Sequence, residues 1–242
     1  MQNNKVVLVV GAGDAIGSAI ATEFAKKGLT VCLARRSADA VQSYAETLRS
    51  DGFDAHGFPL DARNEEQVIA LFDKIEREIG AIEVVVFNIG ANVPMGIVET
   101  SAKKFFKIWE MACFSGFLVG REAARKMLER KRGTILFTGA TASVRGGAMF
   151  AAFASAKHGL RSLAQSMARE LGPKNIHVAH VIIDGAVDTQ WIRENHPDFE
   201  SLNAQEGIVK PNELAQNYVM LYEQPRSAWT FELDIRPWVE KW

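Results

Sequence analysis

The sequence predicts an α/β fold built on a doubly wound parallel sheet with helices on both of its faces. Two observations carry this prediction. Short apolar runs rich in β-branched residues, typical of strands buried on both faces, alternate along the chain with longer segments of helical periodicity. The first run leads through a glycine-rich turn into a helix, which begins a strand–helix–strand unit. Right-handed crossovers between such units restrict the topology to a doubly wound sheet.

Strands are expected at the short apolar runs that glycine, proline or polar residues bound. These runs cover 6–10, 30–34, 84–87, 134–138, 177–183 and 229–235, and a further strand ends just before Asp61. Helices are expected over 16–27, 38–50, 64–79, 101–131, 150–171 and 211–222. Asn64 and Gln67 are placed as a capping box at the start of the third helix. Ligands of such sheets bind beyond the carboxyl ends of the strands, so function is sought in the following loops.

The composition is that of an ordinary globular protein. Hydrophobic residues make up 48% of the 242 residues and charged residues 24%, which excludes a disordered chain. No linker, charge block or repeat marks a boundary, so residues 1–242 are expected to form one domain. The formal net charge of -1 gives no global field for nucleic acid or an acidic membrane, and neither partner is expected.

The cysteines, the histidines and the apolar runs restrict the compartment and the chemistry. Cys32 and Cys113 lie far apart within apolar runs, as expected for two buried hydrophobic residues in a reducing compartment. The histidines lack ligand spacing, so no metal is expected. No apolar stretch is long enough to span a membrane, and the N-terminal one is too short for a secretion signal. The expected location is the cytoplasm.

The first loop carries a glycine motif. Gly11, Gly13 and Gly17 follow the first strand and open the first helix. Glycine lets the backbone turn tightly and approach a pyrophosphate, whose charge then meets the free N–H groups of the helix N-terminus. A tight turn without a ligand is the alternative. The position of the motif, between a strand and a helix, favours a dinucleotide site.

The end of the second strand carries two arginines, Arg35 and Arg36. A site for NAD requires a carboxylate here to accept a hydrogen bond from the ribose 2′-hydroxyl, and Ala34, Arg35 and Arg36 supply none. Guanidinium groups instead suit a 2′-phosphate, with its additional negative charge. The alternative is a solvated basic entrance to the next helix. The pair therefore favours NADP.

With these motifs, the chain resembles the short-chain dehydrogenase/reductase family over essentially its whole length. The landmarks are the loop 11–17, Asp61, Asn88-Ile89-Gly90, Lys157 and the segment 185–189. The resemblance implies a Rossmann-like fold with a seven-stranded parallel sheet. It also implies a set of cofactor-binding residues along the carboxyl edge of that sheet. They are Gly11, Gly13, Ile16, Gly17, Arg35, Arg36, Asp61, Ala62, Asn88, Gly90, Lys157, Val187 and Thr189.

The chain departs from the family at the catalytic positions. The family's tyrosine, four residues before Lys157, is Phe153 here, and its serine is Ala140. The family's asparagine falls on Ala112. The resemblance therefore leaves Lys157 as the remaining catalytic residue, and Phe153 has no exchangeable proton with which to act as an acid. Two smaller departures are Ala15, where the loop usually has glycine, and Asp184, where the family has proline.

Lys157 falls on an apolar stripe of the predicted helix 150–171. An ammonium on such a stripe needs an acceptor, which the ribose hydroxyls of a cofactor would supply. Snorkelling to solvent is the alternative. Thr141 or Ser143 could donate a hydrogen bond near the position of the missing serine, although both are typical of local loop capping.

Two functions remain. One is an NADP-dependent oxidoreductase that acts on an unidentified carbonyl or alcohol, in a pocket lined by 90–98, 141–150 and the substrate loop 185–207. The other is a catalytically weak or inactive NADP-binding sensor or partner protein. Relatives pair the helices corresponding to 101–131 and 150–171, which are rich in small or apolar residues such as Ala123 and Phe153. A homo-oligomer, either a tetramer or a dimer, is therefore expected.

Overall fold

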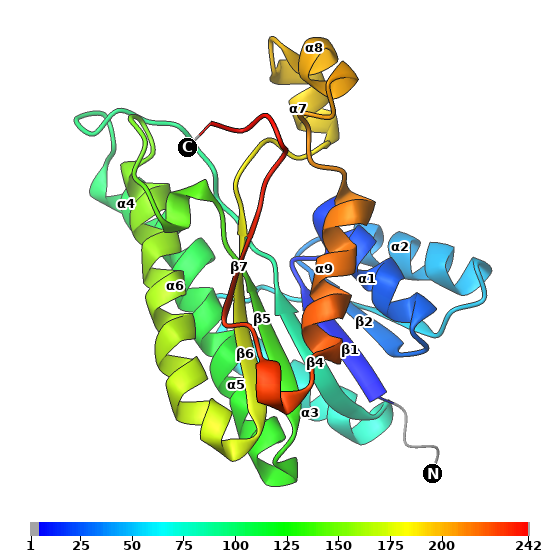
Figure 1. The fold of residues 1–242 in the computed structure, drawn as a ribbon. Coiled ribbons are helices and arrows are strands. Elements are labelled where there is room, and N and C mark those ends of the chain that lie inside the picture. Colours follow the sequence, from blue (N-terminus) through cyan, green and yellow to red (C-terminus); the bar gives the residue numbers. More distant parts are fainter. Residues whose placement is uncertain (1–4, 242) are drawn as a thin grey trace.

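A computed structural model describes residues 5–241, in which seven strands form one parallel sheet in the order β3-β2-β1-β4-β5-β6-β7 (Figure 1). The strands are β1 (Lys5–Val10), β2 (Thr30–Arg35), β3 (Ala55–Pro59), β4 (Ala81–Phe87), β5 (Gly133–Thr138), β6 (Ile176–Ile183) and β7 (Glu232–Ile235). The strand order reverses between β1 and β4. The carboxyl ends of these two strands therefore form the switch point at which such sheets bind ligands. The predicted doubly wound seven-stranded sheet is confirmed.

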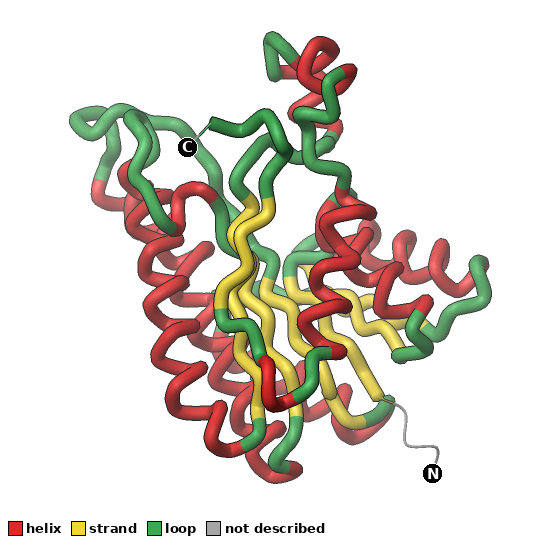
Figure 2. Tube along the Cα trace, in the orientation of Figure 1, coloured by secondary structure: helices red, strands yellow, loops and turns green. Residues whose placement is uncertain are grey.

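Helices cover both faces of the sheet (Figure 2). They are α1 (Ile16–Lys26), α2 (Ala38–Ser50), α3 (Glu65–Glu78), α4 (Ala102–Trp109), α5 (Ser115–Arg130), α6 (Ala151–Leu171), α7 (Gln190–Asn195), α8 (Phe199–Ala204) and α9 (Pro211–Glu223). One apolar core packs α1, α2 and α9 on one face, and a second packs α3, α5 and α6 on the other. Residues of β6 alternate between them: Val178 enters the second core and Ala179 the first.

The helical region expected over 101–131 is present, but it is not one regular α-helix. A π-helical turn, Glu110–Phe114, separates α4 from α5. The inserted turn shifts the helical phase, so that Ile108 before it and Ala112 and Cys113 within it are all buried in one cluster beside α6. The periodicity of the sequence does not mark such an insertion.

Two smaller expectations also need correction. The last strand was expected from 229, but the ladder begins at Glu232, and the ring of Trp229 instead stacks on His177 with centroids 4.8 Å apart. The capping box is only half formed. Asn64 Oδ1 accepts from the N–H of Gln67, whereas the side chain of Gln67 accepts from the N–H of Asp61.

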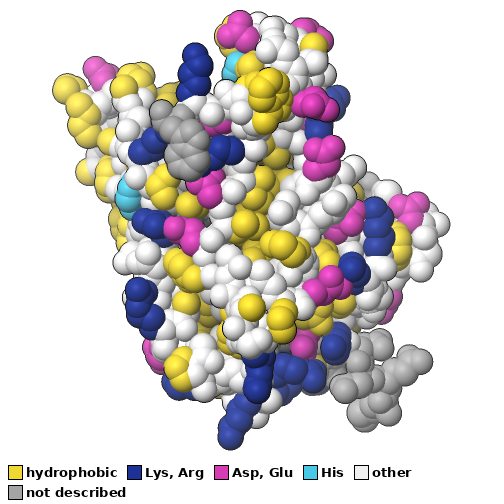
Figure 3. Space-filling model, in the orientation of Figure 1, with side chains coloured by type: hydrophobic (Ala, Val, Ile, Leu, Met, Phe, Trp, Pro, Cys, Tyr) yellow, Lys and Arg dark blue, Asp and Glu magenta, His cyan; other side chains and the backbone are white. Residues whose placement is uncertain are grey.

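Side chains at the surface are mixed in character (Figure 3). Acidic and basic groups are interspersed on the face shown, and apolar side chains gather on the loops that follow β4 and β5. Among residues 5–241, no helix combines the length and the apolar character needed to cross a membrane.

Candidate functional site

The glycine loop lies at the switch point, after β1. Gly11 has a φ of +90°, and a Cβ there would lie 2.6 Å from the carbonyl oxygen of Asn88. A Cβ on Gly17 would lie 2.5 Å from the carbonyl oxygen of Gly11. Both positions therefore require glycine for packing alone. Gly13 differs, because a Cβ there would meet nothing within 4 Å, so this residue faces open space.

The N-terminus of α1 has features that favour a nearby anion. Its N-cap residue, Ala15, makes no side-chain cap, and no acidic residue occupies the first turn. The first N–H groups of a helix lack partners within the helix, and its dipole favours negative charge at this end. Ala15, which stands where the family's loop usually has glycine, is thus the N-cap residue of this helix.

Two cavities adjoin this loop and share Gly11, Gly13 and Asn88 as walls. The first, of about 570 Å³, lies between the ends of β1, β2 and β4. Of the predicted binding residues, it brings together Arg35, Arg36, Asp61, Ala62 and Gly90 in addition to the shared three. Asn88 also fixes the loop, since its Nδ2 donates to the carbonyl oxygen of Gly11 at 3.0 Å.

The second cavity, of about 1260 Å³, lies between α1 and the segment after β6. Ile16, Gly17 and Thr189 line it. Thr189 caps α7, because its Oγ1 accepts from the N–H of Ile192. Val187 lies outside both cavities and instead forms a bridge with Val209 at the base of the projecting segment that carries α7 and α8 (Figure 1).

Two charged residues beside the glycine loop escaped the sequence analysis: Asp14, which lines the second cavity, and Arg63, which lines the first. Asp14 of the glycine loop accepts from Nη1 of Arg35 at 2.5 Å. Arg63 donates to both carboxylate oxygens of Asp61 and holds the pKa of that carboxyl below its usual range. The signal for Asp14 was available: a loop that leaves β1 must pass the end of β2 if the two strands are parallel neighbours.

Lys157 is buried, with 2% of its surface exposed, so it does not snorkel to solvent. Its Nζ donates to the carbonyl oxygens of Thr138 at 2.7 Å and Ile89 at 3.1 Å. Burial lowers the pKa of the ammonium to about 8. Lys157 lines neither of the two cavities but lies directly behind Ile89, which is a wall of the first.

The positions of the missing catalytic groups come together in one apolar cluster. Phe153 and Ala112 are buried in it, and Ala140 packs against it. The ring centroid of Phe153 lies 5.9 Å from Nζ of Lys157. The fold thus brings Lys157 together with three positions whose side chains are hydrocarbon.

Other polar groups near this cluster are held by neighbours. Thr141 Oγ1 donates to Asp184 at 2.6 Å, and Ser143 Oγ accepts from the N–H of Ala140 at 3.1 Å. Ser143 therefore makes the local contact expected of loop capping, whereas Thr141 binds Asp184, 43 positions away in the sequence. Tyr218 is fully buried against Thr138.

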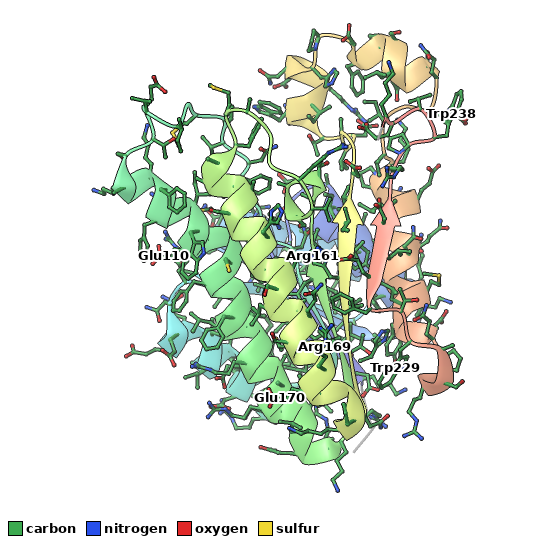
Figure 4. All side chains as sticks on the ribbon, turned by 60° about the vertical axis from the view of Figure 1, so that its left-hand side comes forward. Glu110, Arg161, Arg169, Glu170, Trp229 and Trp238 are labelled. Carbon is green, nitrogen blue, oxygen red and sulfur yellow. The ribbon has the colours of Figure 1, made fainter. Side chains whose placement is uncertain are left out.

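Beneath Ser143, a buried histidine connects α6 with β7. His180 Nδ1 contacts Glu232 at 3.0 Å, and Arg161 on α6 donates to both oxygens of the same carboxylate (Figure 4). Burial lowers the pKa of His180 to about 4. Among residues 5–241, no group of three or more histidine, cysteine or acidic side chains is placed to hold a metal ion.

Comparison with known proteins agrees with this geometry. Residues 5–199 match the family described as short chain dehydrogenase. The chain is 31% identical over 190 residues to the 3-oxoacyl-(acyl-carrier-protein) reductase of Pseudomonas aeruginosa, covering 78% of this chain and 76% of the relative. The structure of a short-chain dehydrogenase from Rhodopseudomonas palustris is 48% identical, with a TM-score of 0.84 over 97% of this chain and 99% of that one.

A further solved structure, an actinorhodin polyketide ketoreductase with NADPH, is 25% identical and has a TM-score of 0.89. It covers 98% of this chain, which in turn covers 97% of the ketoreductase. The likeness therefore extends over the sheet, the glycine loop and the segment after β6. On the match of residues 5–199 and the fold they adopt, the chain belongs to the short-chain dehydrogenase family.

Proposed function

We propose that the chain is an NADP-dependent oxidoreductase acting on a carbonyl or alcohol group of a small molecule. The observation that carries the proposal is the pair of cavities on either side of the glycine loop, with Arg35 and Arg36 at the far end. A dinucleotide suits these residues, because Gly13 faces open space and α1 has an uncapped N-terminus. When bound, the nicotinamide would accept or supply a hydride. The NADPH of the polyketide ketoreductase supports the phosphorylated cofactor.

The proposal assigns each cavity one part of the dinucleotide. Asp61 and Ala62 border the adenine, and Asn88 and Gly90 the adenosine ribose. The loop residues Gly11, Gly13, Ile16 and Gly17 would face the pyrophosphate, and Arg35 and Arg36 the 2′-phosphate. The carboxamide is assigned to Thr189 of the second cavity and to Val187, which lies outside both cavities and would have to be reached beyond them. Lys157 is the catalytic residue that remains. Its ammonium has three N–H donors, and the carbonyl oxygens of Ile89 and Thr138 accept from two of them. The third would donate to the ribose next to the nicotinamide.

The substrate would enter between the loops at the carboxyl edge of the sheet. The segments 90–98 and 141–150 are tied together, since the N–H of Met95 donates to the carbonyl oxygen of Met149 at 2.7 Å. Val93, Ile97 and Met149 expose their side chains there. These segments and 185–207 form the proposed substrate pocket. We propose that residues 1–242 form a single domain that contains it. Turnover should be slow, because Phe153 cannot act as a general acid, and a positioned general acid raises the rate about 10²–10⁴-fold.

The proposal is tested by calorimetric titration with NADPH and NADH, followed by NADPH oxidation with a panel of ketones and aldehydes. NADPH should bind more tightly than NADH, and Arg36→Ala should remove most of that difference. Arg169→Ala, on the exposed end of α6, is the matched control. A preference for NADH that survives Arg36→Ala would contradict NADP dependence. Tight binding without turnover of any carbonyl would favour a sensor or partner protein.

We also propose a homo-oligomer, a tetramer or a dimer, on a revised surface. Ala123 and Phe153 are buried within the protomer and cannot supply it. Instead, the rings of Phe106, Trp109, Phe114 and Phe117 stack in a row along α4 and α5, with successive centroids 6.1–6.2 Å apart. Phe106 is 59% and Phe117 38% exposed, an apolar surface suited to a second copy. Light scattering at micromolar concentration tests this, and a monomer would contradict it.

The same proposal places the protein in the cytoplasm. Cys32 and Cys113 are both free and buried, as suits thiols that remain reduced. Burial also raises the pKa of both thiols, which keeps them protonated and unreactive.

A further inference from the structure

The structure places a carboxylate, that of Asp14, next to Arg35 at the end of β2, where the sequence analysis found only the two arginines. Asp14 follows Gly13 in the glycine loop, and Arg35 ends β2. The N–H groups of Gly11 and Ala12 both donate to the carbonyl oxygen of Ala34, at 2.9 and 3.2 Å. These two bonds fix the loop against the end of β2, and Arg35 Nη1 then meets Asp14 Oδ1 at 2.5 Å.

Asp14 is also the more available of the two carboxylates at this end. Arg63 binds both oxygens of Asp61. Asp14 instead contacts Arg35 through one oxygen, and its side chain is 89% exposed. A ligand that reaches the cavity wall at Arg35 therefore meets a carboxylate with free acceptor positions as well as a guanidinium.

The two forms of the cofactor respond to this pair in opposite ways. A 2′-phosphate is itself an anion, so it must compete with Asp14 for Arg35 and is repelled by the remaining charge. A 2′-hydroxyl is a neutral donor, and a carboxylate is the acceptor that NAD sites supply for it. The same side chain thus weakens binding of one form and supports binding of the other.

We propose that Asp14 sets the cofactor preference of the site, by competing with the 2′-phosphate of NADP(H) for Arg35 and by accepting a hydrogen bond from the ribose hydroxyl of NAD(H). The proposal rests on the dinucleotide function proposed above. The wild-type preference for NADPH should then be modest. It would depend mainly on Arg36, because Asp14 binds Arg35 and not Arg36 in this structure.

The experiment is calorimetric titration of NADPH and of NADH into wild type, Asp14→Asn and Asp51→Asn at low and high salt. Asp51 is an exposed aspartate at the far end of α2 and is the matched control. Asp14→Asn should tighten NADPH about tenfold and weaken NADH about twofold, whereas Asp51→Asn should change neither. The NADPH gain should shrink at high salt, because exposed charges are screened. In an Arg35→Ala background the gain should be smaller, since the two residues act as a pair.

The outcomes separate the two proposals. If both dinucleotides bind the wild type and Asp14→Asn changes neither affinity, or changes both equally, Asp14 does not set the preference and the dinucleotide site stands. Circular dichroism first shows that all of these proteins are folded. If neither dinucleotide then binds the wild type or the variants, both the proposed function and the proposed role of Asp14 are wrong.

Discussion

Lys157 on α6 donates from Nζ to the carbonyl oxygen of Thr138, the last residue of β5, at 2.7 Å. This bond holds the residue proposed above as the remaining catalytic group against the end of β5. It also keeps an ammonium charge in an environment where just 2% of the residue is exposed. Burial of this charge therefore has an electrostatic cost that the carbonyl acceptors offset only in part, and that cost can be measured.

The first prediction concerns the free energy of unfolding at alkaline pH. The pKa of Lys157 is about 8 in the folded protein and 10.5 for an ordinary lysine, so between these values the unfolded chain binds the additional proton. Stability therefore rises with pH across this window, by about 2–3 kcal/mol, as the buried ammonium loses its charge. Below pH 8 the cost is present in full.

Urea unfolding of wild type and Lys157→Met between pH 7 and 10 checks this. Both proteins share every other titrating group, so the difference between their slopes isolates Lys157. Parallel slopes would show that the ammonium is not destabilised by burial.

The second prediction concerns mildly acidic pH. His180 is fully buried, and its pKa is about 4 in the folded protein against 6.5 for an ordinary histidine. Below pH 6.5 the unfolded chain takes up a proton that the folded protein refuses, so stability falls as the pH drops toward 4. The loss is on the order of 3 kcal/mol.

His180→Gln should lose less stability than the wild type over the same range, as measured by urea midpoints at neutral and mildly acidic pH. His56→Gln, at an exposed position beside Asp54, is the control and should follow the wild type. Identical acid sensitivity of wild type and His180→Gln would exclude His180 as the source.

The third prediction separates packing from binding in the glycine loop. Gly17→Ala should destabilise the fold, because its Cβ would lie 2.5 Å from the carbonyl oxygen of Gly11. Gly13→Ala should leave the melting temperature unchanged, because its Cβ meets nothing within 4 Å, yet weaken dinucleotide binding at least tenfold. Gly172→Ala, also in open space but at the end of α6, should affect neither property. Unchanged dinucleotide affinity in Gly13→Ala would show that the pyrophosphate does not approach this residue.

The sequence predicts the sheet well because its signals are local. Buried strands such as β5 and β6 are continuous apolar runs. The glycine loop is recognised by its position between a strand and a helix. The spacing from Lys157 predicts Phe153 and Ala140 as the family's positions, and the segment around Ala112 predicts the third. The structure shows that these three residues lie in or against one cluster.

What the sequence misses depends on tertiary proximity. Asp14 and Arg35 are 21 positions apart and meet only because β1 and β2 are parallel neighbours with the loop bonded to Ala34. Arg63 is local to Asp61, but its bidentate bond depends on the turn that precedes α3. The π turn at 110–114 arises from packing against α6, for which the helical periodicity gives no signal.

The last prediction concerns the chemistry itself. By the resemblance of the sequence, Phe153 corresponds to the family's tyrosine, and its ring centroid lies 5.9 Å from Nζ of Lys157. Phe153→Tyr adds a hydroxyl to a ring that is already in place, and Ala140→Ser with Ala112→Asn adds the other two missing polar groups. The neighbouring ammonium would lower the pKa of the new phenol and favour proton transfer. We expect at most slow NADPH oxidation with common ketones and aldehydes in the wild type. The triple variant should gain about 10²-fold or more if proton donation is what is missing.

Nicotinamide absorbance with one carbonyl panel measures both proteins, and Phe117→Tyr on the exposed face of α5 controls for an added phenol elsewhere. The triple variant must first be shown to bind NADPH as tightly as the wild type, so that the comparison concerns kcat rather than occupancy. Fast wild-type turnover that the substitutions leave unchanged or reduce would show that another group supplies the proton. Thr141 and Asp184, joined by a 2.6 Å hydrogen bond beside Ala140, would then be the pair to replace next, because a hydroxyl held by a buried carboxylate is the remaining proton carrier at this edge of the cluster.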